Sequence, residues 1–240
     1  MVRRKKPEPV PTRADRHRLD DVELVILDFD GVVVDSEVIS LSTLREAIAD
    51  YGVELSLDEV RDRFLGASVR RIMAFVDDHG ARAAKDGFAR HWYQVLFARF
   101  RRELEIMPGL TGLLDCLDAA QTPYCIASSG SFERLGVALQ ATGLASRFAG
   151  RVFSAEQVER GKPAPDLFLH AAREMGASTT RCLVIEDSPA GVAGAKAAAM
   201  RAIGFIGGSH LDNLQDVHRS ALLSHGADAV VTSLRDICQV

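Results

Sequence analysis

Residues 24–31 read Leu-Val-Ile-Leu-Asp-Phe-Asp-Gly, and this short stretch decides the fold. Four apolar, partly β-branched residues end in an acidic segment, which is typical of a buried strand that runs into a polar loop. Further strands of this kind are predicted at Pro123–Ala127, Cys182–Ile185, Ala202–Ile206 and Ala229–Val231. Helix-like stretches or turn residues separate them. This alternation predicts an α/β fold, a doubly wound parallel sheet with helices on both faces, whose ligands bind beyond the carboxyl ends of the strands.

The segment between residues 36 and 106 has a different pattern. No strand-like run occurs there, and Leu41, Leu44, Ile48 and Tyr51 recur at helical spacing. The sequence therefore predicts an inserted all-helical domain over 36–106 and a discontinuous α/β core formed by 21–35 and 107–240. Helices are predicted in the insertion over Leu57–Phe64, Val69–Asp78 and Lys85–Leu104, and in the core over Glu133–Thr142, Asp166–Met175 and Pro189–Ala199.

Length, charge and cysteine content narrow the functional classes. The chain has 240 residues, enough for one domain with an insertion. Its 29 Lys and Arg residues against 33 Asp and Glu residues give a net charge of −4, so a small substrate is expected rather than nucleic acid or an anionic membrane. No apolar stretch reaches the ~20 residues that cross a bilayer. The four cysteines are far apart and suggest neither a zinc site nor a disulfide framework, so a cytoplasmic location is expected.

The first 20 residues are rich in Arg, Lys and Pro and include Arg3-Arg4-Lys5-Lys6. They lack the apolar stretch of a secretory signal, so a mobile basic tail is expected over residues 1–20. A basic arm for nucleic-acid binding or targeting is the alternative interpretation.

Acidic side chains follow two of the predicted strands. Asp28 and Asp30 end the first strand, and Glu186 and Asp187 end a later one. Because a parallel sheet places all four at one edge, they are expected to converge. Two carboxylates ~4 Å apart repel by ~4 kcal/mol at an effective dielectric of about 20, so such a site requires a cation or a raised pKa. Hard oxygen ligands favour Mg²⁺. The alternatives are a solvated acidic turn for the first pair, and a helix cap at Asp187 or Ser188 for the second.

Two further segments fit phosphate. Ser128, Ser129, Gly130 and Ser131 follow a predicted strand at a helix start, where backbone N–H groups and hydroxyls form a natural phosphate cradle. Lys162 lies in the turn Gly-Lys-Pro-Ala-Pro-Asp, whose prolines restrict the backbone and orient the lysine. The alternative interpretation of residues 128–131 is that they are ordinary loop and cap residues, and the alternative for Lys162 is a surface lysine.

Together these segments resemble the haloacid dehalogenase-like (HAD) hydrolase superfamily. Its ordered motifs match residues 28–31, Ser128, Lys162 and 186–187, and the resemblance spans nearly all of residues 24–206. A helical insertion directly after residues 35–37 resembles the branch that contains β-phosphoglucomutases and sugar-phosphate phosphatases. The resemblance implies a Rossmann-like core, with the insertion at 36–106 as a helical cap.

The resemblance also implies catalytic and metal-binding roles. Asp28 would be the nucleophile that forms an aspartyl-phosphate, and Asp30 the acid that protonates the leaving oxygen and then deprotonates the attacking water. Mg²⁺ would be held by the side chain of Asp28, the backbone carbonyl of Asp30 and the side chain of Asp187, with Glu186 in support.

Phosphate binding follows from the same resemblance. Ser128 and the backbone N–H of Ser129 would bind the transferring phosphoryl group, and Lys162 would offset the charge on Asp28 and on phosphate.

Substrate selectivity is expected in the cap, which closes over the site and expels water. The turn Gly66-Ala67-Ser68, followed by Arg70, resembles the substrate-contacting loop of this branch, although adjacent arginines on a helix are also typical of a solvated face. Mutases carry a His early on the first cap helix, where this chain has Ser40, and this departure favours hydrolysis. The seven histidines are scattered and form no ligand-like pair, so they are expected to be surface or core residues.

The sequence thus predicts a phosphoric monoester hydrolase, a Mg²⁺-dependent phosphatase of sugar, sugar-acid or polyol phosphates. A β-phosphoglucomutase-like phosphomutase is the first alternative, and a non-catalytic binding scaffold is the second. The expected partner is a small phosphorylated metabolite, not nucleic acid or a membrane. The substrate and the oligomeric state are left open, and a monomer is compatible with the sequence.

Overall fold

A computed structural model describes residues 19, 21–67, 69–81, 83 and 87–238. The basic tail predicted over residues 1–20 lies outside the described residues apart from Leu19. Within the described part, no helix is long and apolar enough to cross a membrane.

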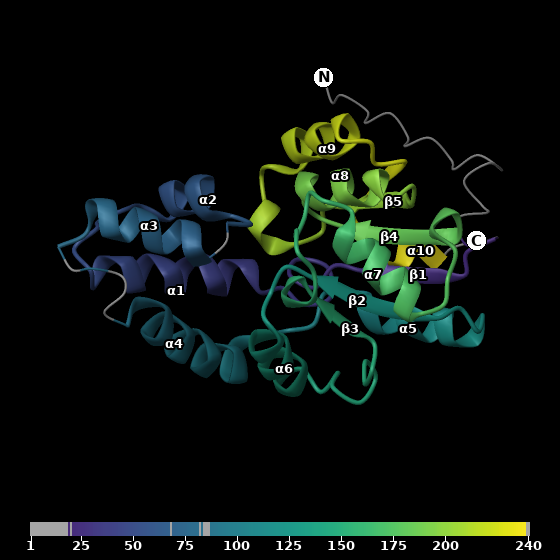
Figure 1. Cartoon of the computed structure of the whole chain (residues 1–240), viewed down its shortest axis with the longest axis horizontal. Coiled ribbons are helices and arrows are strands. Elements are labelled where there is room, and N and C mark those ends of the chain that lie inside the picture. The colour runs from purple at the N-terminus through teal and green to yellow at the C-terminus, as the bar shows by residue number, and fades with distance from the viewer. Residues whose placement is uncertain (1–18, 20, 68, 82, 84–86, 239–240) are drawn as a thin grey trace, which may run out of the picture.

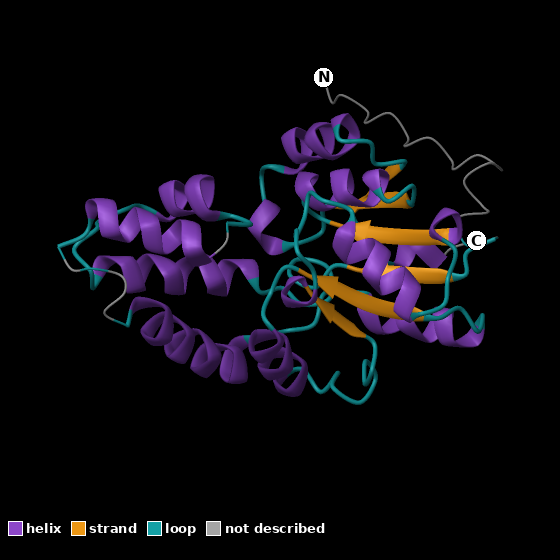
Figure 2. Cartoon of the chain, in the orientation of Figure 1, coloured by secondary structure: helices purple, strands orange, loops and turns teal. Residues whose placement is uncertain are grey.

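A sheet forms the centre of the core, and its strands are drawn in orange in Figure 2. It has six strands in the order β3-β2-β1-β4-β5-β6, and every pair of neighbouring strands is parallel. The strands are β1 Leu24–Leu27, β2 Tyr124–Ser128, β3 Val152–Ser154, β4 Cys182–Glu186, β5 Arg201–Phe205 and β6 Ala229–Val231. The predicted parallel sheet is therefore confirmed. Leu27, the last residue of β1, lies opposite both Ile126 and Ile185, so the loops that follow β1, β2 and β4 share one edge of the sheet.

Both faces of the sheet are covered by helices, which explains why β1 is apolar without alternation. Val25 and Leu27 face the cluster that includes Leu113 of α5, Leu135 of α6 and Ile237 of α10. Leu24 and Ile26 face the opposite cluster, which is built with α7, α8 and α9. The core helices are α5 Leu110–Ala119, α6 Phe132–Ala141, α7 Asp166–Glu174, α8 Pro189–Ala197, α9 Gln215–Ser224 and α10 Arg235–Cys238.

Four helices between β1 and α5 form a separate body beside the sheet edge (Figure 1). They are α1 Glu37–Ala49, α2 Leu57–Phe64, α3 Val69–His79 and α4 Phe88–Glu103. Leu41, Leu44, Ile48 and Tyr51, which recur at helical spacing in the sequence, are buried in an apolar cluster that belongs to this insertion. The C-terminal half of α4 also contributes Phe97 and Phe100 to the core cluster, so the insertion packs against the core through α4.

The two connections between insertion and core run side by side. Val34 and Ile106 form an antiparallel bridge, and the backbone N–H of Asp35 donates to the carbonyl of Glu105 at 3.1 Å. The N–H of Met107 donates to the carbonyl of Val33 at 2.9 Å. The chain therefore leaves and re-enters the core at one place.

Cysteine pairing differs from the sequence interpretation in one respect. Cys125 and Cys182 are free and buried, as expected of core residues. Cys116 is disulfide-bonded, which the spacing of the cysteines did not suggest.

Candidate active site

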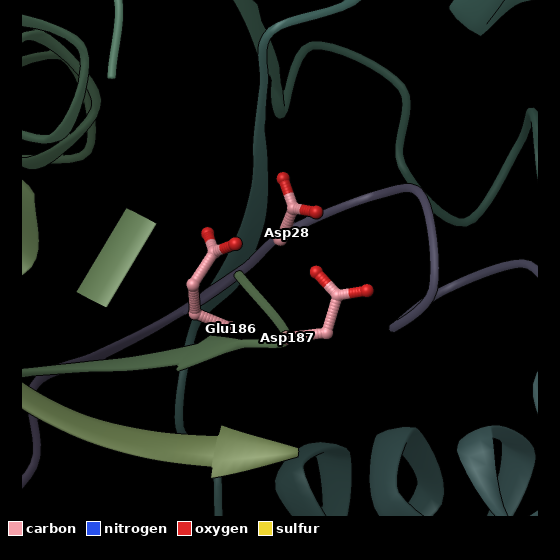
Figure 3. A group of neighbouring side chains, drawn as sticks. All are labelled: Asp28, Glu186 and Asp187. Carbon is pink, nitrogen blue, oxygen red and sulfur yellow. The ribbon is translucent and has the colours of Figure 1, made fainter. Parts of the chain in front are cut away.

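Three carboxylates meet at the edge where β1 and β4 end. Asp28, Glu186 and Asp187 each offer an oxygen within 4.8 Å of the others, and all three residues are buried. Figure 3 shows their carboxyl groups facing the same space. The parallel pairing of β1 with β4 brings them together, because Leu27, the last residue of β1, lies opposite Ile185, the residue before Glu186. The convergence of acids expected from the sequence is what the structure shows for these three residues.

Lys162 lies among these acids. Its Nζ is 2.5 Å from Asp28 Oδ1 and 2.7 Å from Glu186 Oε2, and its side chain is only 5% exposed. The ammonium also lies 5.2 Å from the centre of the Phe168 ring. Burial alone would lower the pKa of Lys162, but Asp28 and Glu186 outweigh burial and hold the pKa above its usual value. The lysine is therefore charged at any physiological pH.

The cluster carries more negative than positive charge. Burial raises the pKa of Asp28 well above its ordinary value, Glu186 and Asp187 add to the rise, and Lys162 opposes it. Burial likewise raises the pKa of Glu186, again against Lys162. Three carboxylates face one ammonium, so the cluster has an excess charge of about −2 when all are ionised. A divalent cation with a preference for oxygen ligands fits this donor set, and Mg²⁺ is such a cation.

Two glycines make room for the acids. Gly31 has φ +78°, and a Cβ there would lie 2.0 Å from Asp187 Oδ2. A Cβ on Gly191 of α8 would lie 2.0 Å from the carboxyl carbon of Glu186. Side chains at either position would displace a carboxylate of the cluster.

The start of α8 fixes Glu186 rather than Asp187. Ser188 caps the helix by accepting from the N–H of Gly191 at 3.0 Å, and its hydroxyl donates to Glu186 Oε1 at 2.7 Å. The helix-capping alternative therefore holds for Ser188. Asp187 instead faces the acid cluster, where His210 Nε2 lies 3.3 Å from its Oδ2.

Asp30 lies in the same loop as Asp28 but has different partners. The hydroxyl of Ser36 donates to Asp30 Oδ1 at 2.5 Å, and Nη2 of Arg134 donates to the same oxygen at 2.7 Å. The side chain of Asp30 is 14% exposed. One oxygen of this carboxylate is thus held by two donors from separate segments.

The loop after β2 is held by its own hydroxyls. The N–H of Gly130 donates to Ser128 Oγ at 3.0 Å, and the hydroxyl of Ser154 donates to the carbonyl of Gly130 at 2.6 Å. Ser131 caps α6, and Ser129 is exposed. Because the oxygen of Ser128 already accepts a hydrogen bond, its hydroxyl proton can be donated to a ligand. The loop and the helix N-terminus together suit an anion.

A cavity of about 750 Å³ lies between this sheet edge and the helical insertion. Gly66 and Ala67 line it from the insertion. Ser68 lies outside the described residues, and Arg70 is exposed and does not line the cavity. The core residues predicted from the sequence that line it are Asp28, Asp30, Ser128, Ser129, Lys162, Glu186 and Asp187.

A model of the haloacid dehalogenase-like hydrolase family matches residues 22–199 of the chain. The chain belongs to this family. Among its relatives is the 6-phosphogluconate phosphatase of Escherichia coli (strain K12), which is 32% identical over 191 residues that cover 79% of this chain and 85% of the relative.

Solved structures give the same assignment. A haloacid dehalogenase-like protein of unknown function from Agrobacterium tumefaciens str. C58 is 34% identical, with a TM-score of 0.73 and coverage of 90% of this chain and 96% of that one. A HAD family hydrolase from Deinococcus radiodurans R1, solved with bound phosphate and sodium, is 29% identical, with a TM-score of 0.73 and coverage of 90% and 93%. The predictions of a HAD-like hydrolase and of a phosphoric monoester hydrolase are confirmed.

Among the cavity residues of this HAD-like hydrolase that were not predicted from the sequence are Glu37, Arg134 and His210. Burial, reinforced by Asp30 and opposed by Arg134, raises the pKa of Glu37 to about 7. Arg134 lies in the first turn of the helix after the Ser128 loop, and His210 lies in a single 3₁₀ turn, Ser209–Leu211, in the loop after β5. Their place directly beyond the carboxyl ends of strands was the available signal.

Proposed function

We propose that this HAD-like hydrolase is a Mg²⁺-dependent phosphatase of small sugar, sugar-acid or polyol phosphates that works through an aspartyl-phosphate. One observation carries the proposal. Asp28, Glu186 and Asp187 converge within 4.8 Å beside Lys162, where a 750 Å³ cavity meets the carboxyl edge of the sheet. This arrangement offers a nucleophilic carboxylate, a divalent-cation site and a fixed cation in one place.

The donor set supports a choice of metal ligands. Asp28 and Asp187 would hold Mg²⁺ through their side chains, and Asp30 through its backbone carbonyl. Glu186 would support them, because Lys162 already occupies its Oε2 and Ser188 its Oε1. When bound, Mg²⁺ offsets the negative charge of the phosphate and of the carboxylates.

In the first half-reaction an oxygen of Asp28 attacks phosphorus. A bond forms between that oxygen and phosphorus, and the bond from phosphorus to the ester oxygen breaks. The leaving oxygen takes the proton of Asp30 and departs as an alcohol. Ser128 and the N–H of Ser129 would bind the phosphoryl oxygens, while Lys162 offsets their charge.

The second half-reaction uses the same two acids in reversed roles. Asp30, now ionised, takes a proton from water, and the hydroxyl oxygen bonds to phosphorus. The bond between phosphorus and Asp28 breaks, which releases inorganic phosphate and restores both side chains. One carboxyl group thus serves first as acid and then as base.

The substrate class rests on the cavity and on the relatives. A cavity of about 750 Å³ suits a small phosphorylated metabolite, and a relative bears the name 6-phosphogluconate phosphatase. We propose that residues 36–106 act as a cap on the core of 21–35 and 107–240, with Gly66 and Ala67, which line the cavity, contributing to the choice of substrate. The cytoplasmic location and the lack of nucleic-acid and membrane partners stay predictions.

Phosphomutase activity is disfavoured by one residue. Ser40 of α1 stands where mutases carry a His, and its hydroxyl accepts from Arg134 at 3.1 Å instead of offering an imidazole to a substrate. A non-catalytic scaffold is disfavoured by the intact set of acids. Hydrolysis is therefore the function that we test first.

The test is a screen of phosphorylated sugars, sugar acids and polyols for release of inorganic phosphate, with and without Mg²⁺. We expect release that EDTA stops and that Asp28→Asn reduces to background. Asp115→Asn is the matched control, because Asp115 is an exposed ion-pair residue outside the cavity. Phosphate release by Asp28→Asn at the rate of the unaltered enzyme would refute the aspartyl-phosphate. Isomerised sugar phosphate without net release would favour a mutase.

A further inference from the structure

One arginine joins the core to the insertion next to Asp30. Arg134 belongs to α6 of the core, and its Nη2 donates to Asp30 Oδ1 at 2.7 Å and to Ser40 Oγ of α1 at 3.1 Å. Its guanidinium carbon lies 5.7 Å from the centre of the Phe100 ring of α4. A single side chain therefore touches the loop of Asp30 and two helices of the insertion, and α4 packs beside α6 in Figure 1.

We infer that Arg134 is a positioning residue that holds Asp30 in the orientation for proton transfer. The inference rests on the acid and base role proposed for Asp30. It also explains the contact with the insertion. Ser40 and Phe100 of the insertion lie against Arg134 and fix its side chain beside Asp30.

The hydrogen bonds on Asp30 leave one oxygen for chemistry. Ser36 and Arg134 both donate to Oδ1. Oδ2 accepts no hydrogen bond from the residues that the structure describes. Two donors on one oxygen stop the carboxyl from rotating, so Oδ2 is presented to the leaving oxygen in the first step and to water in the second.

The ion pair between Arg134 and Asp30 is exclusive within the described part of the chain and largely shielded from solvent. Asp30 is the one carboxylate within ion-pair distance of Arg134 among the described residues, and the two side chains are 14% and 16% exposed. Burial alone would lower the pKa of Arg134, but Asp30 and Glu37 outweigh it and raise the pKa. The guanidinium is therefore a constant cation, unlike a group that would itself gain and lose a proton during turnover.

The alternative role for Arg134 is to bind the phosphate of the substrate. Comparing substrates whose leaving groups differ in basicity distinguishes the two roles. A sugar alkoxide needs the proton of Asp30 to depart, whereas p-nitrophenolate departs without it. The ratio kcat/KM reports the steps up to formation of the aspartyl-phosphate. Loss of positioning should therefore lower kcat/KM for an alkyl phosphate far more than for p-nitrophenyl phosphate, while loss of phosphate binding should lower both equally.

The experiment compares Arg134→Gln with the unaltered enzyme on 6-phosphogluconate and p-nitrophenyl phosphate. We expect kcat/KM to fall about tenfold to a hundredfold for the alkyl ester and less than about threefold for the aryl ester. For both esters kcat should fall, because the water step needs Asp30 as a base. Arg134→Lys should restore part of the loss, since it keeps the charge but not the planar contacts with Ser40 and Phe100.

The control is Arg99→Gln, which removes an arginine that bridges α4 to Ser42 and Thr43 of α1 without lining the cavity. It should leave the ratio of the two kcat/KM values unchanged. The melting temperature of each variant is measured to test whether unfolding causes a loss of activity. An equal fall for both esters in Arg134→Gln and Arg134→Lys would overturn the positioning role. Failure of the unaltered enzyme to hydrolyse either ester would overturn the phosphatase assignment itself, and the positioning role with it.

Discussion

Lys162 shows how much a single buried cation matters in this site. Lys162→Gln leaves Asp28 and Glu186 facing each other without their common partner, in surroundings where Lys162 is 5% and Glu186 1% exposed. Breaking a buried ion pair from one side costs about 3–5 kcal/mol. We expect the free energy of unfolding of the metal-free protein to fall by about 3 kcal/mol or more, measured by urea denaturation at pH 7.5.

The matched control for this variant is Lys196→Gln. Lys196 pairs with Asp228 at 2.9 Å, but the two side chains are 35% and 48% exposed. An exposed pair contributes less than about 1 kcal/mol, so this variant should change stability little. Equal losses in the two lysine variants would show that burial does not strengthen the dependence on Lys162.

Glu37 gives the metal-free protein a pH dependence of known sign. Burial first, then Asp30, raises the pKa of Glu37 from 4.5 to about 7, against the opposing charge of Arg134. The folded protein therefore binds more protons than the unfolded chain between pH 4.5 and about 7, and this contribution to stability is lost as the pH rises through that window. It amounts to at most ~3 kcal/mol.

Glu37→Gln removes this titrating group. We expect the variant to lose less stability than the unaltered protein between pH 5 and pH 7.5, measured as the free energy of unfolding in EDTA. Glu46→Gln, on an exposed position of the same helix, serves as the control and should follow the unaltered protein. If Glu37→Gln shows the same slope as the control, the raised pKa of Glu37 is wrong.

At the residue scale, the sequence identifies those site residues that belong to a short local pattern. Asp28 with Asp30, and Glu186 with Asp187, are visible as pairs at strand ends. Arg134 and His210 are isolated in the sequence, and only the packing of α6 against the insertion and of the loop after β5 against Asp187 brings them to the site. Their place after a strand was a general signal, but which residues of those segments reach the site depends on tertiary structure.

At the scale of elements, the turn after β1 depends on a glycine. Gly31 has φ +78°, and a Cβ there would lie 2.0 Å from Asp187 Oδ2. Gly31→Ala should therefore push Asp187 out of the acid cluster in addition to straining the backbone by about 1–2 kcal/mol. We expect its affinity for Mg²⁺ to fall at least tenfold, measured by isothermal titration calorimetry.

Gly143→Ala is the control that separates backbone strain from displacement of Asp187. Gly143 has φ +73°, nearly the same as Gly31, but a Cβ there would meet no atom within 4 Å. This variant should lose similar backbone stability and keep its affinity for Mg²⁺. Unchanged affinity in Gly31→Ala as well would mean that Asp187 is not a ligand, or that the turn relaxes without moving it.

Most elements with a clear local pattern were predicted whatever their length, and several others were missed. Leu57–Phe64 matches α2, and Ala229–Val231 matches β6, because periodicity or β-branching marks them clearly. The strand β3, Val152–Ser154, has three residues and no apolar run, so pairing with β2 defines it rather than its own composition. The helices α5, α9 and α10 were also not predicted.

For the whole molecule, Mg²⁺ should act as a stabilising ligand. A cation that binds the folded protein and not the unfolded chain raises the unfolding free energy, by about 2.7 kcal/mol at 100 times its Kd. The excess negative charge of the acid cluster gives the physical reason for binding. We expect the melting temperature to rise with the Mg²⁺ concentration in the unaltered protein and in Asp115→Asn, but not in Asp187→Asn. A similar rise in Asp187→Asn would exclude Asp187 as a ligand.

The paired backbone at Val34 and Ile106 has a consequence for how such enzymes diversify. Because the inserted segment begins and ends at this one bridge, its helices can lengthen, shorten or be exchanged without shifting the register of the sheet. A chimaera in which residues 37–103 are replaced by the equivalent segment of a relative should acquire the substrate preference of that relative while keeping its own chemical step. New specificities can thus arise by recombination of one contiguous stretch of gene, with the reactive machinery inherited intact.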